Sequence, residues 1–257
     1  MKMKKAFTLA EILLVVAIIG TVSVLTVNNA VKSSNTAEKI TKLRKTYDIL
    51  QTAIMAGMDR YGHVYSWGYA SNETTDEALN RSTINKALMP FLKVEKDCST
   101  GTGCWTSTFK PNLSSKTIDS NKMYYKAILA NGASIAITFV QMQARVSYLA
   151  GGTSLYGDYP YNDQDCAWVY IDVDGPNKGS GKAGEDVFAF ILFNENGLYP
   201  YGNNITIKYT DFDRDPSCPS MGEYCTAWAL YKGNQDYFTC PDKLSWTDPE
   251  KSHCPVE

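Results

Sequence analysis

The sequence has few of the residues on which enzyme chemistry and nucleic-acid binding depend. Only two histidines occur in 257 residues, His63 and His253, and neither lies in a Ser/His/Asp or Cys/His catalytic signature. The motifs G-x-S-x-G and H-E-x-x-H and the phosphate-binding loop are absent. The net charge is -2 and the pI is near 5.8, so no basic surface for nucleic acid is expected. We therefore expect neither an enzyme nor a nucleic-acid-binding protein.

The cysteines also lack a metal-binding pattern. No C-x-x-C pair is present, which argues against a zinc site. All seven cysteines lie in the part of the chain that follows the N-terminal apolar run, which fits a domain in an oxidising compartment. Neighbours in sequence suggest three short disulfide loops, although other connectivities stay open and Cys166 is left over. The candidate pairs are Cys98 with Cys104, Cys218 with Cys225, and Cys240 with Cys254.

The N-terminus carries the only long apolar run. Three lysines at positions 2, 4 and 5 precede it, and the 21 residues from Phe7 to Val27 would span roughly 30 Å as a helix, about one hydrocarbon thickness. The lysines would stay on the cytoplasmic side under the positive-inside rule. The run therefore predicts a membrane helix with the N-terminus inside and the rest of the chain outside.

One acid, Glu11, stands at the front of this run and limits its interpretation. A carboxylate in hydrocarbon costs roughly 2.5 to 3.5 kcal/mol, so such a residue needs a partner. A cleaved secretory signal has an apolar centre of about 7 to 15 residues without an acid, and Asn28-Asn29-Ala30 is a poor cleavage site. A lipoprotein signal would need a cysteine directly after the run. A plain membrane anchor stays open but leaves Glu11 unexplained.

The segment Lys4-Lys5-Ala6-Phe7-Thr8-Leu9-Ala10-Glu11-Ile12-Leu13-Leu14 resembles the prepilin-type leader of type IV pilins and type II secretion pseudopilins. The resemblance implies cleavage between Ala6 and Phe7 by a prepilin peptidase, followed by N-methylation of the Phe7 amine. It also gives Glu11 a partner, the Phe7 amine of a neighbouring subunit, so that two charges neutralise each other. The segment departs from the family in Ala6, where Gly is most frequent, and in Asn28, where many members have Pro.

The resemblance implies an α+β, pilin-like fold. A long N-terminal α-helix, with its first half spanning the membrane, would pack on an antiparallel β-sheet whose loops are pinned by disulfides. We accordingly divide the chain into a leader at 1–6, a transmembrane and assembly helix at 7–29, an amphipathic continuation at 30–61 and an extracytoplasmic globular domain at 62–257.

The amphipathic continuation is predicted independently by its hydrophobic periodicity. Apolar residues recur at spacings of three and four, which predicts one stripe facing a core. The stripe consists of Ile40, Leu43, Tyr47, Leu50, Ile54 and Tyr61. Charged residues are expected on the other faces, namely Lys39, Lys42, Arg44, Lys45, Asp48 and Asp59.

The globular part predicts a short helix and several antiparallel strands. The helix covers 75–92 and is disrupted near its end by Pro90. Strands are expected at 123–130 and 134–140 around an Asn131-Gly132 hairpin turn, and at 166–173 and 187–193, with a turn at 194–197. The tail from Asp211 is expected to be rich in turns.

An acidic, glycine-rich stretch at 171–186 is the stronger of two candidates for ion binding, the other being the acids at 211–215. Asp172, Asp174, Asn177 and Asp186 could supply oxygen ligands to calcium, and major pseudopilins carry a calcium site in a C-terminal loop, although their motif is not reproduced here. The alternative is a polar hairpin loop in which Asp and Asn bond their own backbone. Two further acidic groups, at 211–215 and at Asp158, Asp163 and Asp165, are expected to form a plain turn and a solvated loop.

These features predict a structural subunit of a pilus or pseudopilus, either a type II secretion pseudopilin or a minor type IV pilin. The expected partners are prepilin peptidase, other pilin or pseudopilin subunits, an inner-membrane assembly platform and membrane lipid. We expect a single-pass protein of the bacterial inner membrane that then enters an extracytoplasmic fibre, with calcium as the only candidate cofactor. A pilin-like adhesin or binding module is the first alternative, and a membrane-anchored enzyme is the second.

Overall fold

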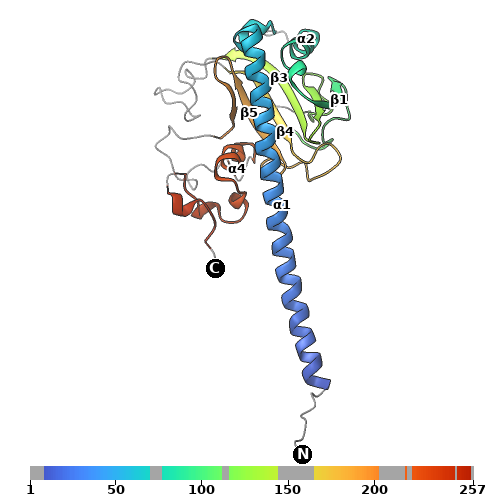
Figure 1. Cartoon of the computed structure of the whole chain (residues 1–257), viewed down its shortest axis with the longest axis vertical. Helices are drawn as coiled ribbons and strands as arrows, with labels where there is room; N and C mark the ends of the chain where they lie inside the picture. Colours follow the sequence, from blue (N-terminus) through green and yellow to red (C-terminus); the bar gives the residue numbers. More distant parts are fainter. Residues whose placement is uncertain are drawn as a thin grey trace, which may run out of the picture. The chain divides into compact units, whose positions relative to one another are not determined.

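The computed structural model describes residues 9–69, 77–111, 116–143, 165–202, 218, 222–246 and 248–255, with side chains described from residue 35 onward except at 140–143. The chain divides into two compact units, residues 1–38 and 39–257. Helix α1 (Leu9–Tyr61) begins in the first unit and ends in the second, which also contains the whole sheet (Figure 1).

Helix α1 is continuous over 53 residues and ends at the predicted position. Tyr61 is followed by Gly62 at φ +80°, a left-handed conformation that glycine adopts without a steric penalty. The Gly62 amide donates to the carbonyl of Met58 at 2.8 Å, which satisfies one of the last helix carbonyls. The predicted stripe faces the core, with Tyr47 and Tyr61 partly buried at its side. Its fully buried members are Ile40, Leu43, Leu50 and Ile54.

The predicted fold class is wrong in one respect. Within the residues that the structure describes, no helix is long and apolar enough to cross a membrane, which contradicts the membrane-spanning first half. The side chains of α1 that the structure describes begin at residue 35 and belong to its charged second half, where five of the ten residues from Lys39 to Asp48 are charged and each charge is costly in hydrocarbon. The α+β class, the antiparallel sheet and the disulfide-closed loops are present.

Six antiparallel strands form one sheet in the order of the sequence (Figure 1). The strands are β1 (Val94–Ser99), β2 (Tyr125–Leu129), β3 (Ser134–Gln143), β4 (Asp165–Asp172), β5 (Val187–Phe193) and β6 (Gly197–Pro200). Each strand pairs with the next, so the sheet is a meander. The predicted hairpin at Asn131-Gly132 joins β2 to β3, and Gly132 has the positive φ, +78°, that such a turn needs.

The sequence predictions missed both edge strands and the helical tail. β1 carries three consecutive charged residues, Glu95, Lys96 and Asp97, and therefore lacks an apolar alternation. β6 has only four residues and directly follows the predicted turn. The helix expected at 75–92 is α2 (Glu77–Ala87), followed by a 3₁₀ turn at Met89–Phe91 that contains Pro90. The tail contains α4 (Thr226–Lys232) and 3₁₀ turns at Gly222–Cys225, Asp236–Phe238, Pro241–Lys243 and Pro249–Lys251.

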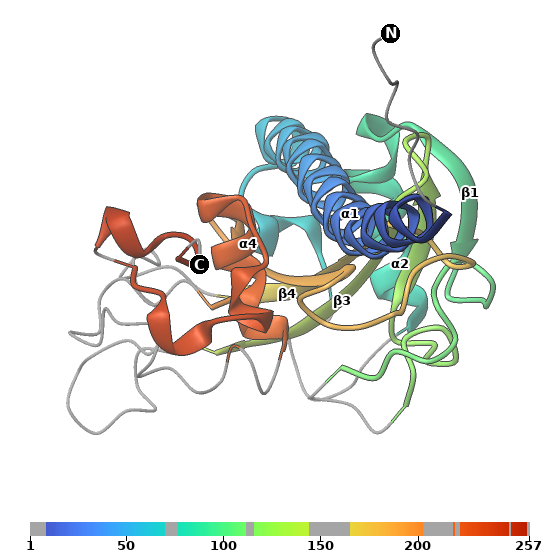
Figure 2. The same cartoon turned by 90° about the horizontal axis from the view of Figure 1, so that it is seen from below.

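The two strands β4 and β5 are buried at every residue. On one face of the sheet, Leu43, Leu50 and Ile54 of α1 share one buried cluster with Val169 and Phe188, and Figure 2 shows α1 on one side of β3 and β4. The opposite face is covered by an aromatic cluster. This cluster includes Trp105, Phe109, Tyr124, Trp168, Tyr170 and Tyr201. Because both faces of β4 and β5 are buried, their sequences are nearly continuous apolar runs instead of an alternation of apolar and polar residues.

Side chains of α1 also bond the backbone beside the sheet. The Tyr47 hydroxyl donates to the carbonyl of Leu198 in β6 at 3.0 Å. The Leu198 amide donates to Gln51 Oε1 at 2.7 Å. Arg44 Nε donates to the carbonyl of Leu230 in α4 at 3.0 Å. The helix is therefore fixed to the domain by directional bonds as well as by apolar packing.

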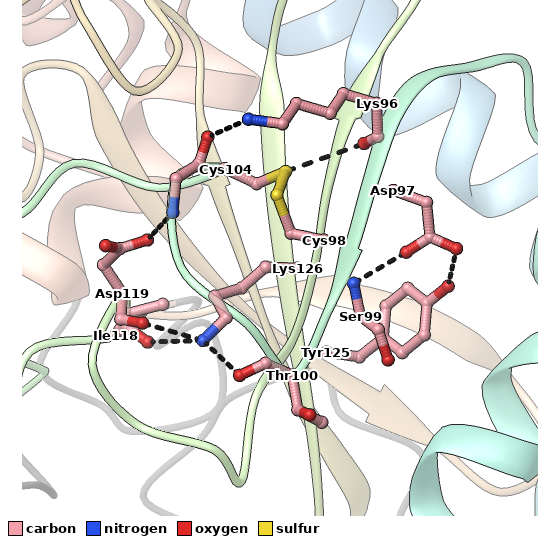
Figure 3. The surroundings of a disulfide bond; sticks show 11 residues. Lys96, Asp97, Cys98, Ser99, Thr100, Cys104, Ile118, Asp119, Tyr125 and Lys126 are labelled. Atoms are coloured by element: carbon pink, nitrogen blue, oxygen red, sulfur yellow. Dashed lines mark hydrogen bonds between the residues drawn. A yellow bond between two sulfur atoms is a disulfide. The ribbon is translucent and has the colours of Figure 1, made fainter.

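Three disulfides join the pairs that the sequence suggested, Cys98–Cys104, Cys218–Cys225 and Cys240–Cys254. Cys166 lies buried in β4 outside these pairs. The Cys98–Cys104 loop lies beside a buried lysine, Lys126 of β2, whose side chain is 0% exposed (Figure 3).

Lys126 connects two loops through its ammonium group. Nζ donates to the carbonyls of Thr100, Ile118, Asp119 and Asn121 at 3.2, 3.2, 2.9 and 3.1 Å. Burial lowers the pKa of the Lys126 ammonium, and the negative charges of Asp119 and Glu77 partly offset this effect. The buried cation is therefore stabilised by carbonyl dipoles rather than by direct contact with a carboxylate.

We expect Lys126→Met to lower the free energy of unfolding by about 3 kcal/mol, because it leaves buried carbonyls without a donor. Urea denaturation would measure the loss. Lys122→Met is the matched control, since Lys122 is exposed four residues earlier, and should change stability by less than about 0.5 kcal/mol. Equal losses from the two variants would contradict the role given to Lys126.

Candidate functional site

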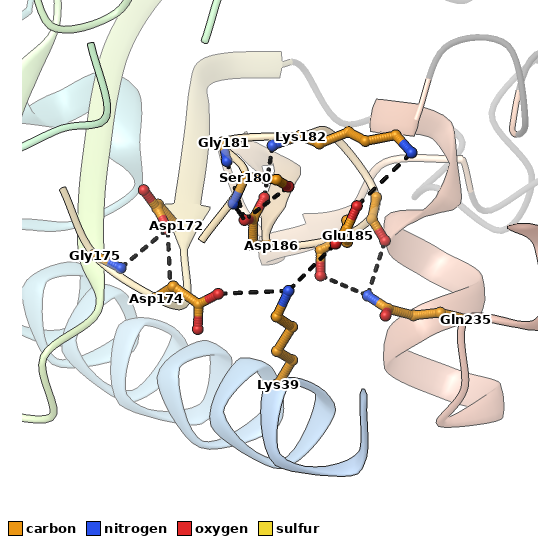
Figure 4. A network of polar contacts seen from close by, with 11 residues as sticks. Lys39, Asp172, Asp174, Gly175, Ser180, Gly181, Lys182, Glu185, Asp186 and Gln235 are labelled. Carbon is orange, nitrogen blue, oxygen red and sulfur yellow. Dashed lines mark hydrogen bonds and ion pairs between the residues drawn. The ribbon is translucent and has the colours of Figure 1, made fainter. Parts of the chain in front are cut away.

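The connection between β4 and β5 is the candidate site, because it holds all four predicted calcium ligands. Asp172 is the last residue of β4 and Val187 the first of β5, and the two are paired in the register. The Val173 amide donates to the carbonyl of Asp186 at 2.9 Å, which closes the base of the loop. We call residues 173–186, together with Asp172, the acidic loop (Figure 4).

Asp186 is fully buried and organises one arm of the acidic loop. Its Oδ2 accepts hydrogen bonds from the amide of Ser180, from the hydroxyl of Ser180 and from the amide of Gly181, and its Oδ1 accepts from the amide of Lys182. A side chain at Gly179, which has φ +74°, would collide with this carboxylate and with Asp174. Both oxygens of Asp186 are therefore occupied by the loop itself.

Asp172 organises the other arm and is also 0% exposed. Its Oδ1 accepts hydrogen bonds from the amides of Asp174 and Gly175 at 3.1 and 3.0 Å. Its Oδ2 is buried without a hydrogen-bond partner, as is the hydroxyl oxygen of Ser134, the residue opposite Asp172 in the register. Burial, and secondly the charge of Asp186, raises the pKa of the Asp172 carboxyl to about 8, although the two amides favour its ionised form.

Asp174 pairs with a lysine of helix α1. Its Oδ2 lies 3.5 Å from Nζ of Lys39, and the same nitrogen lies 3.6 Å from Oε1 of Glu185. Lys39 is 8% exposed, whereas the sequence placed it on a face away from the core. Lys39 lies four residues before Leu43, and residues four apart share one face of a helix, so this spacing could have placed Lys39 beside the buried stripe.

Residues of the C-terminal segment bond the arm of the loop that contains Gly184 and Glu185. Gln235 Nε2 donates to the carbonyls of Gly184 and Glu185 at 3.0 and 2.6 Å. The hydroxyl of Tyr237 also donates to the Gly184 carbonyl. The loop is thus a junction at which the sheet, α1 and the C-terminal segment meet (Figure 4).

The predicted calcium ligands are therefore only partly brought together. Asp172 and Asp186 lie in the interior of the loop, Asp174 points to Lys39, and Asn177 is exposed. Across the described ranges, no group of three or more His, Cys, Asp or Glu side chains is placed to hold a metal ion. Calcium binding stays a prediction, and the polar-loop alternative agrees with the bonds that Asp172 and Asp186 make to backbone amides.

The remaining predicted residues have mixed outcomes. Ala6 and Phe7 lie outside the described residues, as do Asp158, Asp163 and the acidic group at 211–215. Glu11 lies in α1, and its side chain is outside the description. Asp165 was expected in a solvated loop, but it is the first residue of β4 and is 3% exposed. That expectation is wrong, because pairing with Phe193 of β5 draws Asp165 into the sheet.

We expect Asp172→Asn to remove a pH-dependent loss of stability. The carboxyl is protonated more readily in the fold, with a pKa of about 8 against its ordinary 3.8, so wild-type stability is lost as the pH rises from about 4 to about 8. At pH 7 the variant should gain up to about 4 kcal/mol over wild type. Urea denaturation at about pH 4 and about pH 8 would measure the difference, which should be small at the lower pH.

Asp186→Asn is the matched control for this experiment. Its amide nitrogen would face backbone donors that the carboxylate now accepts, so this variant should lose stability at both pH values. A wild-type and an Asp172→Asn protein with the same pH dependence would contradict the assignment of the raised pKa to Asp172.

No protein-family model, no curated protein and no solved structure matches this chain. The resemblance of the N-terminal segment to prepilin leaders accordingly stays a prediction.

Proposed function

We propose that the chain is a structural subunit of an extracytoplasmic fibre, a type II secretion pseudopilin or a minor type IV pilin. The observation that carries the proposal is the segment from Lys4 to Leu14, in which a single acid, Glu11, interrupts the start of the apolar run. In this proposal a prepilin peptidase cuts between Ala6 and Phe7, and the mature chain joins other subunits on an assembly platform.

The charge chemistry of the segment supports an assembly role. Cleavage removes Lys2, Lys4 and Lys5 and creates an amine on Phe7, four residues before Glu11. A carboxylate among apolar side chains is costly unless a cation compensates it. Pairing between Glu11 and the Phe7 amine of a neighbour would neutralise both charges only in the assembled fibre, so the acid would act as a register key between subunits.

The continuity of helix α1 adds support from the fold. Glu11 and the buried stripe of the domain belong to the same helix, Leu9–Tyr61. Within the second unit, Tyr47 and Gln51 bond β6 while Arg44 bonds α4. A segment that docks on neighbouring subunits would thus be covalently continuous with a helix that is firmly fixed to its own domain.

The three disulfides are compatible with the proposed compartment. Disulfides persist in oxidising surroundings such as the periplasm or the cell surface, and the fold contains three of them. An extracytoplasmic location belongs to the proposal and would be tested together with processing.

The mature N-terminus should begin at N-methylated Phe7 when the protein is produced in a host that has a prepilin peptidase. Mass spectrometry of the N-terminal peptide would identify it. Replacing Ala6 by a bulky residue should block cleavage, since the leaders that this segment resembles have a small residue before the cut. An unprocessed Met1 on otherwise stable wild-type protein would refute the processing step.

Glu11→Ala should abolish incorporation into fibres, because the Phe7 amine loses its partner, while cleavage and domain folding are retained. Fibre preparations and cell fractions probed with an antibody would separate these outcomes. Glu38→Ala is the matched control, since Glu38 is an exposed acid on the same helix and should assemble normally. Normal fibres from Glu11→Ala would rule out the charge pairing.

A further inference from the structure

The acidic loop carries four acids within fifteen residues. Asp172, Asp174, Glu185 and Asp186 belong to it. Asp172 and Asp186 are 0% exposed, and the side chains of Asp174 and Glu185 are 23% and 36% exposed. Anions held close together in a protein interior are stable only when a proton, a metal ion or a basic side chain compensates them. Among the residues that the structure describes, the buried basic group at this place is the ammonium of Lys39.

Lys39 occupies the position of a bridging ion. Its Nζ lies 3.5 Å from Asp174 and 3.6 Å from Glu185, which stand on opposite arms of the loop. Lys182 also reaches Glu185, at 3.7 Å, but its side chain is 59% exposed and lies over the ring of Phe238 at 4.4 Å. Lys182 is therefore a solvated neighbour, and Lys39 is the cation inside the junction.

The oxygens that calcium would need are already engaged. Calcium takes six to eight oxygen ligands. Both carboxylate oxygens of Asp186 already accept hydrogen bonds from backbone amides and a hydroxyl. The carboxylate of Asp174 is paired with the ammonium of Lys39. Asp172 has one oxygen without a partner. The four residues that the sequence marked as ligands thus do not present a set of free oxygens to one ion.

We propose that Lys39 is the intramolecular counter-cation of the acidic loop, and that its ammonium compensates the negative charge of Asp174 and Glu185 in place of a bound divalent ion. The ammonium draws the two arms together through Asp174 and Glu185, and no metal is required. Because the cation comes from α1, the loop closes fully only when this helix is docked. Without Lys39, the same carboxylates become a site for a divalent cation such as calcium.

Thermal unfolding of wild type, Lys39→Met and Lys45→Met, in chelator and in about 5 mM calcium, tests this proposal. The wild-type Tm should be the same in both media. Lys39→Met should melt roughly 5 °C lower in chelator and recover part of that loss in calcium. Lys45→Met, an exposed lysine on the same helix, should behave like wild type.

Two results would overturn the proposal. One is a wild-type Tm that rises with calcium as much as that of Lys39→Met, which would identify a metal site that coexists with the lysine. The other is a Lys39→Met protein that loses no stability or gains nothing from calcium.

A rescue variant covers the case in which Lys39→Met does not fold. Adding Asp174→Asn and Glu185→Gln removes the anions that Lys39 compensates, so the triple variant should fold, melt above Lys39→Met and show no calcium response. Lys39→Arg keeps the charge and should stay independent of calcium. A triple variant as unstable as Lys39→Met would show that Lys39 acts through packing instead.

Discussion

β4 and β5 are covered by protein on both faces, by α1 on one and by the aromatic cluster on the other. Polar groups near these strands have little access to water and must find their partners within the protein. Lys126, Asp172, Asp186 and Lys39 are all nearly inaccessible. Lys126 bonds two loops beside β2, Asp172 and Asp186 belong to the acidic loop, and Lys39 reaches that loop from α1. The double coverage therefore determines both the core and the charge chemistry of the molecule.

The buried charges are compensated in different ways. Lys126 uses only backbone carbonyls, and Asp186 uses mainly backbone amides, so both hold loops in place without an ionic partner. Lys39 uses carboxylates from two arms of one loop. The negative charge of Asp172 is compensated least. Burying this charge is unfavourable, so the carboxyl binds a proton more readily and its pKa is raised to about 8.

The sequence predicted best where a pattern repeats along the chain. The three-four spacing of apolar residues located the second half of α1, and Asn131-Gly132 located the β2–β3 hairpin, because local sterics determine both. The edge strand β1 was missed since its consecutive charges break the alternation. The burial of Lys39 and of Asp165 was missed because it depends on contacts with segments far away in sequence. The membrane-spanning half was inferred from hydropathy and family resemblance, and the described residues contradict it.

The bonds from Tyr47 and Gln51 to Leu198 have a consequence for how the sheet can meet other chains. They occupy the amide and the carbonyl of one residue in β6, and free backbone groups of this kind are what an added strand would use. At the opposite edge, β1 presents Glu95, Lys96 and Asp97 as exposed side chains. One border of the sheet is thus obstructed at Leu198 by its own helix, and the other carries charges, so both borders disfavour the addition of a strand from another chain.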